Sequence, residues 1–197
     1  MAERTVETWN DHYARDAARW DLGGAPPVLE RLLESEPEAM KVLVPGAGKG
    51  NDALAWARAG HAVTAVDYAP LAIEIMGGRA SEAGLPLEVV QADVTQLPDS
   101  FAQRFDRIWE QTCLCALPPR LRRPYLEQAR RALRPGGEML ALLWNHGRPE
   151  GPPFDMSHAL VEDLLDGLFR VRSREPVVDS TTARVPEFLW RLEPLTV

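Results

Sequence analysis

Short apolar runs alternate with longer helical segments along the first half of this chain. Residues 42–44, 62–66 and 87–91 are apolar in the manner of strands that are buried on both faces of a parallel sheet. Helices are expected to begin near Asn51 and at Pro70, since proline is well tolerated in a first helical turn. Strands that alternate with helices predict an α/β fold.

The second half of the chain continues this alternation. Further strands are expected at 105–110, 138–144, 169–173 and 188–192, the last two as an antiparallel pair at one end of the sheet. Helices are expected at 28–33, 119–133 and 158–168, the last capped by Ser157, and a tight turn is expected at 134–137. The chain shows no internal repeat and no linker, so residues 1–197 are predicted to form a single domain.

Three glycines at alternate positions follow the first predicted strand, in the sequence PGAGKGND. Gly46, Gly48 and Gly50 let the backbone turn sharply and leave room for a ligand against the peptide groups. The next strand ends at Asp67, where a carboxylate in such a βαβ unit accepts hydrogen bonds from ribose hydroxyls. The spacing predicts a crevice for a nucleoside between the glycine turn and this carboxylate.

Asp52 favours one class of nucleoside cofactor. Dinucleotide enzymes usually show G-x-G-x-x-G, with a pyrophosphate over the helix N-terminus. A carboxylate at Asp52 would repel a pyrophosphate, but it could accept from the ammonium group of S-adenosylmethionine. Three alternatives stay open: a purely structural turn, an NAD(P)-dependent oxidoreductase of Rossmann type, and a non-catalytic cofactor-binding module.

Polar side chains also follow the later strands, at the edge where open α/β sheets place ligands. Asp93 could accept from an adenine amino group, or it could simply cap the following turn. Glu110 and Thr112 would emerge beside the reactive end of the cofactor. His146 could orient a substrate, although a lone histidine on a loop is more often only solvated.

Aromatic residues mark the N-terminal segment, residues 1–25. Trp9, Tyr13 and Trp20 are spaced so that one helical face could carry them all. The segment is predicted to be either a helix docked on the core or a lid whose aromatic side chains cover a cofactor or substrate. A flexible entry loop at 21–27 follows it.

The composition bounds the partners and the compartment. The 197 residues carry a net charge of −7, and such an acidic surface is a poor partner for nucleic acid. No apolar run is long enough to span a bilayer, so we expect no membrane partner. Cys113 and Cys115 are too close for an ordinary structural disulfide and too few for a zinc site. We therefore expect no metal and a cytoplasmic location.

Several motifs together resemble a known family. They are WDLGGAPP, VLVPGAGKGNDALAWARAGHAVTAVDYAPLAIE, QADV, FDRIWEQTCLCALPP and GPPFDMS. The chain resembles class I S-adenosylmethionine-dependent methyltransferases, and within them the thiopurine S-methyltransferase-like family, which includes thiol, thiocyanate and halide methyltransferases. The resemblance implies one Rossmann-like domain with a seven-stranded, mostly parallel sheet, helices on both faces and an antiparallel last strand.

The resemblance also implies a reaction and a set of site residues. The methyl group of S-adenosylmethionine would pass to a small soft nucleophile, most simply a thiol, leaving S-adenosylhomocysteine. The expected partner is a small-molecule acceptor, and the protein is expected to be a monomer. The cofactor-binding residues would be Trp9, Trp20, Gly46, Gly48, Gly50, Asp52, Asp67, Tyr68, Asp93, Val94 and Glu110. No catalytic residue is assigned, and the nearest candidates are Glu110, Thr112 and His146.

Overall fold

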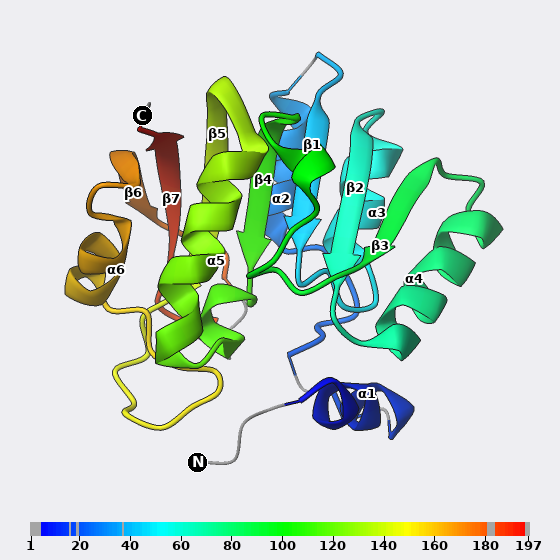
Figure 1. The fold of residues 1–197 in the computed structure, drawn as a ribbon, viewed down its shortest axis with the longest axis horizontal. Coiled ribbons are helices and arrows are strands. Elements are labelled where there is room, and N and C mark those ends of the chain that lie inside the picture. The colour runs from blue at the N-terminus through cyan, green and yellow to red at the C-terminus, as the bar shows by residue number, and fades with distance from the viewer. Residues whose placement is uncertain (1–4, 16, 19, 37, 181–183, 196–197) are drawn as a thin grey trace. The chain divides into compact units, whose positions relative to one another are not determined.

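A seven-stranded mixed sheet organises the structure, a computed structural model that describes residues 5–15, 17–18, 20–36, 38–180 and 184–195. The strand order is β3-β2-β1-β4-β5-β7-β6 (Figure 1). The chain consists of two compact units, residues 1–94 and 95–197. The predicted strands are all present among the described residues, and the antiparallel last strand is confirmed.

The first unit contains three parallel strands. They are β1 (Lys41–Pro45), β2 (Ala62–Asp67) and β3 (Leu87–Gln91), and β2 pairs with both of the others. The central residues of β1 and β2 are buried, as their apolar sequences predict. The parallel pairing brings the carboxyl ends of the three strands to the same edge of the unit.

Four helices belong to the first unit: α1 (Val6–Ala14), α2 (Pro27–Glu34), α3 (Asn51–Arg58) and α4 (Pro70–Glu82). The β1–α3–β2 and β2–α4–β3 connections cross the sheet in the same direction, and right-handed crossovers therefore put α3 and α4 on one face. Figure 1 shows α1 lying beyond the arrowhead of β2. The N-terminal helix is thus at the carboxyl edge of these strands.

The second unit contains the other four strands: β4 (Phe105–Gln111), β5 (Leu133–Trp144), β6 (Phe169–Pro176) and β7 (Glu187–Pro194). β4 and β5 are parallel, whereas β7 runs antiparallel to both β5 and β6. Trp109 and Trp190 are fully buried in this unit, and they fill much of its core.

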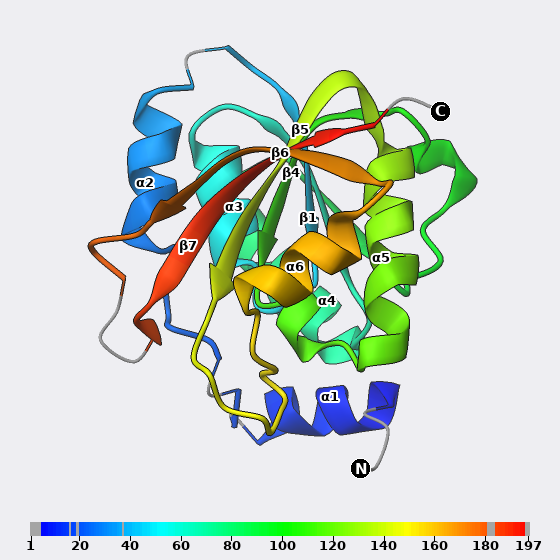
Figure 2. The same cartoon turned by 90° about the vertical axis from the view of Figure 1, so that its left-hand side faces the viewer.

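Helices α5 (Pro119–Ala132) and α6 (His158–Leu165) lie on the same side of β5 and β7 (Figure 2). The Arg123 guanidinium joins them, since its Nη2 donates to the carbonyl of Asp166 at 3.1 Å. Two short 3-10 turns, η1 (Asp99–Phe101) and η2 (Leu114–Ala116), precede and follow β4. Every helix in the described ranges is too short or too polar to traverse a lipid bilayer.

The outer strand of the second unit carries a row of arginines. β6 is the last strand in the sheet order, and Arg170, Arg172 and Arg174 are exposed along it. Arg172 pairs with Glu193 at 2.8 Å, and Arg174 pairs with Glu162 at 3.0 Å. Charged side chains on an edge strand oppose the addition of a further strand.

Three local predictions were wrong. The turn expected at 134–137 lies within β5, where Leu133 pairs with Phe105 and Glu138 pairs with Arg107, so the extra residues form an irregularity inside the strand. Helix α6 ends at Leu165 because Asp166 is extended and Gly167 has a positive φ of 68°. Ser157 stands at the N-cap position of α6, but its side chain makes no capping hydrogen bond.

Candidate functional site

The glycine turn after β1 is built from left-handed backbone. Gly46, Gly48 and Gly50 have φ values of 62°, 57° and 82°, which an L side chain adopts only with strain. Gly50 also lacks space for a side chain, because a Cβ there would lie 2.6 Å from Cγ of Met76 on α4. Gly50 is therefore required for packing as well as for conformation.

Asp67 at the end of β2 is tied directly to this turn. Its Oδ2 accepts a hydrogen bond from the backbone N–H of Gly48 at 2.8 Å, and its Oδ1 accepts from Ala69 at 2.9 Å. The residue is only 7% exposed. Burial raises the pKa of the Asp67 carboxyl, while the backbone hydrogen bonds act in the opposite direction. A carboxylate has about four lone-pair directions, so the backbone N–H groups of Gly48, Ala69 and Tyr68 do not use all of them.

The N-terminal segment covers the glycine turn. A Cβ atom at Gly48 would lie 3.1 Å from the hydroxyl oxygen of Tyr13, so the missing side chain leaves room for that hydroxyl. Tyr13 and Ala18 pack in one apolar cluster with Ala69 and Ala72 at the start of α4. The N-terminal segment thus packs against both the glycine turn and the start of α4.

Trp9 and Trp20 pack against the same cluster, but they do not lie on one helix as expected. Helix α1 ends at Ala14, and Trp20 follows in a turn. The chain folds back so that the Trp20 ring meets the Trp9 ring edge-on at 5.3 Å and the Tyr13 ring at 5.8 Å. The aromatic side chains gather as predicted, although by tertiary packing rather than by helical spacing.

A polar network joins the end of the N-terminal segment to the residues that follow the glycine turn. The Asp21 carboxylate accepts hydrogen bonds from the Gly23 N–H at 2.8 Å and from the Asn51 amide at 2.7 Å, and Lys49 Nζ lies 3.4 Å away. Burial alone would raise the pKa of Asp21, but these hydrogen bonds and the Lys49 charge lower it. Arg79 donates to Asn51 Oδ1 at 2.8 Å and so orients the amide.

The remaining predicted residues of the first unit lie around the same edge. Asp52 is in the first turn of α3, and Tyr68, which directly follows Asp67, is 40% exposed. Asp93 and Val94 follow β3, whose exit is joined to β2 by a 3.1 Å hydrogen bond from the Ala92 N–H to the Asp67 carbonyl. The glycine turn, the carboxylates and the N-terminal aromatic residues therefore lie at one end of the unit.

Glu110 in the second unit is a buried carboxylate that is hydrogen-bonded to the backbone following β4. It is 0% exposed, and its Oε1 accepts from the backbone N–H groups of Cys113 at 3.1 Å and Leu114 at 2.8 Å. The Tyr125 hydroxyl donates to its Oε2. Burial raises the pKa of Glu110 to about 7, although the hydrogen bonds lower it. Thr112, between these contacts, has a strained φ of 64°.

These contacts show what Glu110 does locally. It fixes the backbone that leaves β4, and both of its oxygens already accept hydrogen bonds from the chain. The expected closeness of Glu110 and Thr112 to the transferred methyl group stays a prediction. His146 lies at the exit of β5, where its side chain is 3% exposed rather than solvated.

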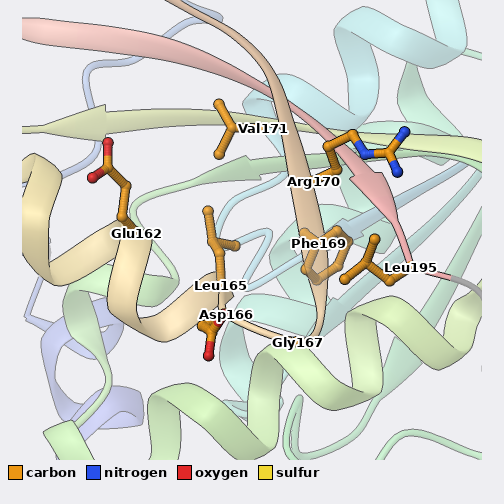
Figure 3. A pocket seen from close by; sticks show the side chains of 8 residues that line it. All are labelled: Glu162, Leu165, Asp166, Gly167, Phe169, Arg170, Val171 and Leu195. Atoms are coloured by element: carbon orange, nitrogen blue, oxygen red, sulfur yellow. The ribbon is translucent and has the colours of Figure 1, made fainter.

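A separate surface hollow of about 320 Å³ occurs where α6 leads into β6 (Figure 3). Its lining residues are Glu162, Leu165, Asp166, Gly167, Phe169, Arg170, Val171 and Leu195. None of the residues predicted from the sequence to bind cofactor or substrate lines it. In the described ranges, no group of three or more His, Cys, Asp or Glu residues is arranged to hold a metal ion.

The family model for thiopurine S-methyltransferase matches residues 4–188. The chain belongs to the thiopurine S-methyltransferase family. This methyltransferase is 31% identical over 172 residues to probable thiol methyltransferase 2 of Arabidopsis thaliana, with 84% of this chain and 74% of the relative covered. It is also 31% identical over 174 residues to the 2-heptyl-1-hydroxyquinolin-4(1H)-one methyltransferase of Mycobacteroides abscessus, covering 84% and 75% of the two chains.

A solved structure supports the fold assignment of this methyltransferase. The 1,6-didemethyltoxoflavin-N1-methyltransferase of Burkholderia thailandensis superposes with a TM-score of 0.75 at 21% identity, over 98% of this chain and 87% of the other. The predicted Rossmann-like class I methyltransferase fold is confirmed. The chain is an S-adenosylmethionine-dependent methyltransferase, and the oxidoreductase alternative is not favoured.

Parts of the site could not be found from the sequence. The sequence indicates Tyr13 only as an aromatic residue at helical spacing, and no pattern marks its hydroxyl as the group next to Gly48. Asp21 and Asn51 lie 30 positions apart and carry no shared motif. The only signal for Tyr125 was its place on the helix after the predicted proline start.

Proposed function

We propose that this enzyme transfers the methyl group of S-adenosylmethionine to a small soft nucleophile, a thiol or thiolate. The observation that carries the proposal is the Asp67 carboxylate, held 2.8 Å from the glycine-turn N–H of Gly48 beneath an aromatic lid. The names of the thiol and thiopurine methyltransferase relatives support a sulfur acceptor.

The first unit would bind and orient the cofactor. Asp67 would accept from the ribose hydroxyls with the lone-pair capacity that its backbone donors leave open. Asp52, in the first turn of α3, would accept from the ammonium group, and Asp93 would accept from the adenine amino group. When bound, S-adenosylmethionine supplies a methyl group on a positively charged sulfur.

The lid would exclude water from the reaction. Trp9, Tyr13 and Trp20 form an edge-to-face cluster whose apolar rings would close over the cofactor. A thiolate that loses its water shell becomes more reactive, and it needs no strong general base. In-line positioning alone can supply roughly 7–11 kcal/mol of barrier reduction. We therefore expect no single side chain to be indispensable for the chemical step.

The test is methyl transfer from labelled S-adenosylmethionine. The full chain is incubated with a panel of thiols, a thiopurine, thiocyanate, iodide and the hydroxyquinolone named for the mycobacterial relative. Labelled methyl thioether from at least one sulfur acceptor is the expected result. Transfer only to the hydroxyquinolone oxygen would overturn the sulfur assignment, and it would leave the methyltransferase class intact.

A second measurement separates the remaining alternatives. Calorimetric titration should detect S-adenosylhomocysteine binding and no NADH binding. Tight binding of S-adenosylhomocysteine without turnover on any acceptor would favour a non-catalytic binding module. Preference for NADH would contradict the assignment.

We further propose a single-domain monomer that acts on small molecules in the cytoplasm. Cys113 and Cys115 are buried and form no disulfide, which is compatible with a reducing compartment. The net charge of −7 argues against nucleic acid as a partner. Light scattering of the purified chain tests the oligomeric state, and a dimeric mass at micromolar concentration would refute it.

A further inference from the structure

The Asn51 side chain has only one orientation that suits its two charged neighbours. Arg79 Nη1 on α4 donates to Asn51 Oδ1 at 2.8 Å, and Asn51 Nδ2 donates to Asp21 Oδ1 at 2.7 Å. A guanidinium only donates hydrogen bonds, and an ionised carboxylate only accepts them. Turning the amide over would set donor against donor at Arg79 and acceptor against acceptor at Asp21. Arg79 therefore determines which end of the Asn51 amide faces Asp21.

The Asp21 carboxylate is held in its ionised form. Burial alone would raise the pKa of Asp21, but hydrogen bonds from Gly23 and Asn51 and the Lys49 charge lower it. Only 14% of the Asp21 side chain is exposed, so water competes little for these contacts. Hydrogen bonds to an ionised group are roughly twice as strong as those between neutral groups. The bond from Asn51 to Asp21 is therefore a strong connection between α3 and the N-terminal segment.

Asp21 transmits this restraint to the aromatic residues before it. Its backbone N–H donates to the Ala18 carbonyl at 2.9 Å, and Ala18 is buried in the same cluster as Tyr13. The Trp20 side chain, which directly precedes Asp21, packs against this cluster. A movement of Asp21 away from Asn51 would therefore disturb the packing of the N-terminal segment.

Arg79 also supports the glycine turn. The same Nη1 atom donates to the Lys49 carbonyl at 2.6 Å. Met76 precedes Arg79 by one turn of α4, so both face the same way, and Met76 occupies the space that a side chain at Gly50 would need. One face of α4 thus holds the backbone of the turn and the amide of Asn51 that follows it.

A second contact joins the N-terminal segment to α4 without Arg79. Asn10 Oδ1 on α1 accepts a hydrogen bond from the backbone N–H of Leu71 at 2.8 Å. Asn10 and Asp21 therefore restrain the segment at two separate points. Only the restraint at Asp21 depends on the orientation that Arg79 imposes on Asn51, so Asn10 provides a reference within the same unit.

We propose that Arg79 is a positioning residue that slows the release of the nucleoside cofactor and of its demethylated product. Arg79 acts through Asn51 and Asp21, and these three side chains form the Arg79–Asn51–Asp21 network. The inference rests on the proposed function, in which the N-terminal segment closes over the cofactor. Release then requires this segment to move, and each hydrogen bond that must break first lowers the release rate.

The test is the rate at which labelled S-adenosylhomocysteine leaves the full chain, chased with excess unlabelled compound and without a methyl acceptor. Arg79→Met should speed release about fivefold or more, because the Asn51 amide can then turn away from Asp21. Arg79→Lys keeps a charged donor and should restore part of the slow release. Arg58→Met, at the exposed end of α3, is the matched control and should change nothing. Equal rates in Arg79→Met and the unsubstituted chain would overturn the proposal.

Double substitutions separate this network from a general loosening of the fold. Asp21→Ala already breaks the network, so adding Arg79→Met to it should speed release by less than about twofold. Asn10→Ala loosens the segment through Leu71 instead, so Arg79→Met should there keep its full factor of about fivefold or more. If Arg79→Met has the same factor in both backgrounds, Arg79 acts on the glycine turn alone and the network is refuted.

A nearly isosteric variant covers the case in which Arg79→Met does not fold. Asn51→Asp still accepts from Arg79 but sets a second carboxylate against Asp21, so it must speed product release at least about fivefold. The Asn51 side-chain amide, identified in nitrogen-15 NMR spectra by its loss in Asn51→Asp, should exchange its hydrogens slowly with water and faster in Arg79→Met. Slow release in Asn51→Asp, or unchanged exchange in a folded Arg79→Met, contradicts the assignment.

This inference and the proposed function can fail separately. Product release that depends on Arg79 and Asn51, without methyl transfer to any acceptor, would reject the proposed function and keep the network. Unchanged release in Arg79→Met and Asn51→Asp, with normal methyl transfer, would reject the network and keep the function. During turnover, Arg79→Met should raise the KM for S-adenosylmethionine without lowering kcat. A lower kcat at unchanged KM would show that Arg79 serves the chemical step instead.

Discussion

The Asp67 carboxylate accepts a 2.8 Å hydrogen bond from the backbone N–H of Gly48. One buried side chain therefore holds the shape of the glycine turn and also presents an anionic edge to whatever lies against that turn. A second bond from Ala69 fixes the carboxylate plane. Substitutions at Asp67 test the proposed second role, which is to bind the nucleoside.

Asp67→Ala should weaken S-adenosylhomocysteine binding by about 10- to 100-fold, because hydrogen bonds to a charged group are lost. Asp67→Asn retains one acceptor oxygen, so its affinity for S-adenosylhomocysteine should fall between those of the unsubstituted chain and Asp67→Ala. Calorimetry gives the affinities, and Glu74→Ala on exposed α4 surface is the control. Methyl transfer at saturating cofactor should decrease much less. Unchanged affinity in Asp67→Ala would remove this carboxylate from the cofactor site.

The Asp21 network predicts how firmly the lid is attached. Asp21→Ala removes the acceptor of the Gly23 N–H and of the Asn51 amide. Amide hydrogen exchange at Gly23 and at the neighbouring lid residues should become faster, and cofactor binding should weaken about fivefold or more because the lid closes less often. Asp11→Ala, which breaks only an exposed pair with Arg15, should change neither quantity.

Glu110 predicts a pH-dependent stability. Its pKa is about 7 in the folded chain and near 4.5 when exposed, so the folded chain binds more protons between these values. The free energy of unfolding should therefore decrease as pH rises from about 4.5 to about 7, by roughly 3 kcal/mol for this residue, and level off above.

Glu110→Gln isolates that contribution, because the amide oxygen can still accept from Cys113 and Leu114. Urea unfolding of both proteins across this pH range gives the difference. We expect Glu110→Gln to lack the decrease while sharing the remaining pH dependence. Parallel curves for the two proteins would show that the Glu110 carboxyl does not titrate there.

Alanine substitutions at two glycines should change the stability of the fold in opposite directions. Gly50→Ala should destabilise the fold by about 1–3 kcal/mol, because φ is 82° and Met76 Cγ would lie 2.6 Å from the new Cβ. Gly78→Ala, within α4 and with no heavy atom within 4 Å of a Cβ, should stabilise the helix by up to about 1 kcal/mol. Thermal unfolding measures both. Equal effects would mean that Gly50 is not constrained.

The sequence alone predicts structural features that depend on residues close together in the chain. Buried strands such as Ala62–Asp67 appear as apolar runs, and the position of Asp67 at a strand end follows from them. The left-handed turn at Gly48 was likewise marked by glycine itself. These features depend on neighbours in the chain, which a pattern can show.

Other features depend on partners distant in sequence. The Tyr13 hydroxyl meets Gly48, and Glu110 meets Tyr125, only after the tertiary packing is complete. The sequence leaves His146 either orienting a substrate or solvated, and a loop histidine has no local pattern that indicates burial. Its burial results from Trp144 and from the loop that folds back over it.

The arginines on β6 have a consequence in concentrated solution. A second molecule that approached this backbone edge would have to desolvate the ion pairs that Arg170, Arg172 and Arg174 make with glutamates, which opposes the addition of a strand. Crowded protein should therefore not elongate into ribbons through this side of the sheet. Replacing the three arginines with valine would leave an uncharged, apolar edge strand, which is a template for fibril formation.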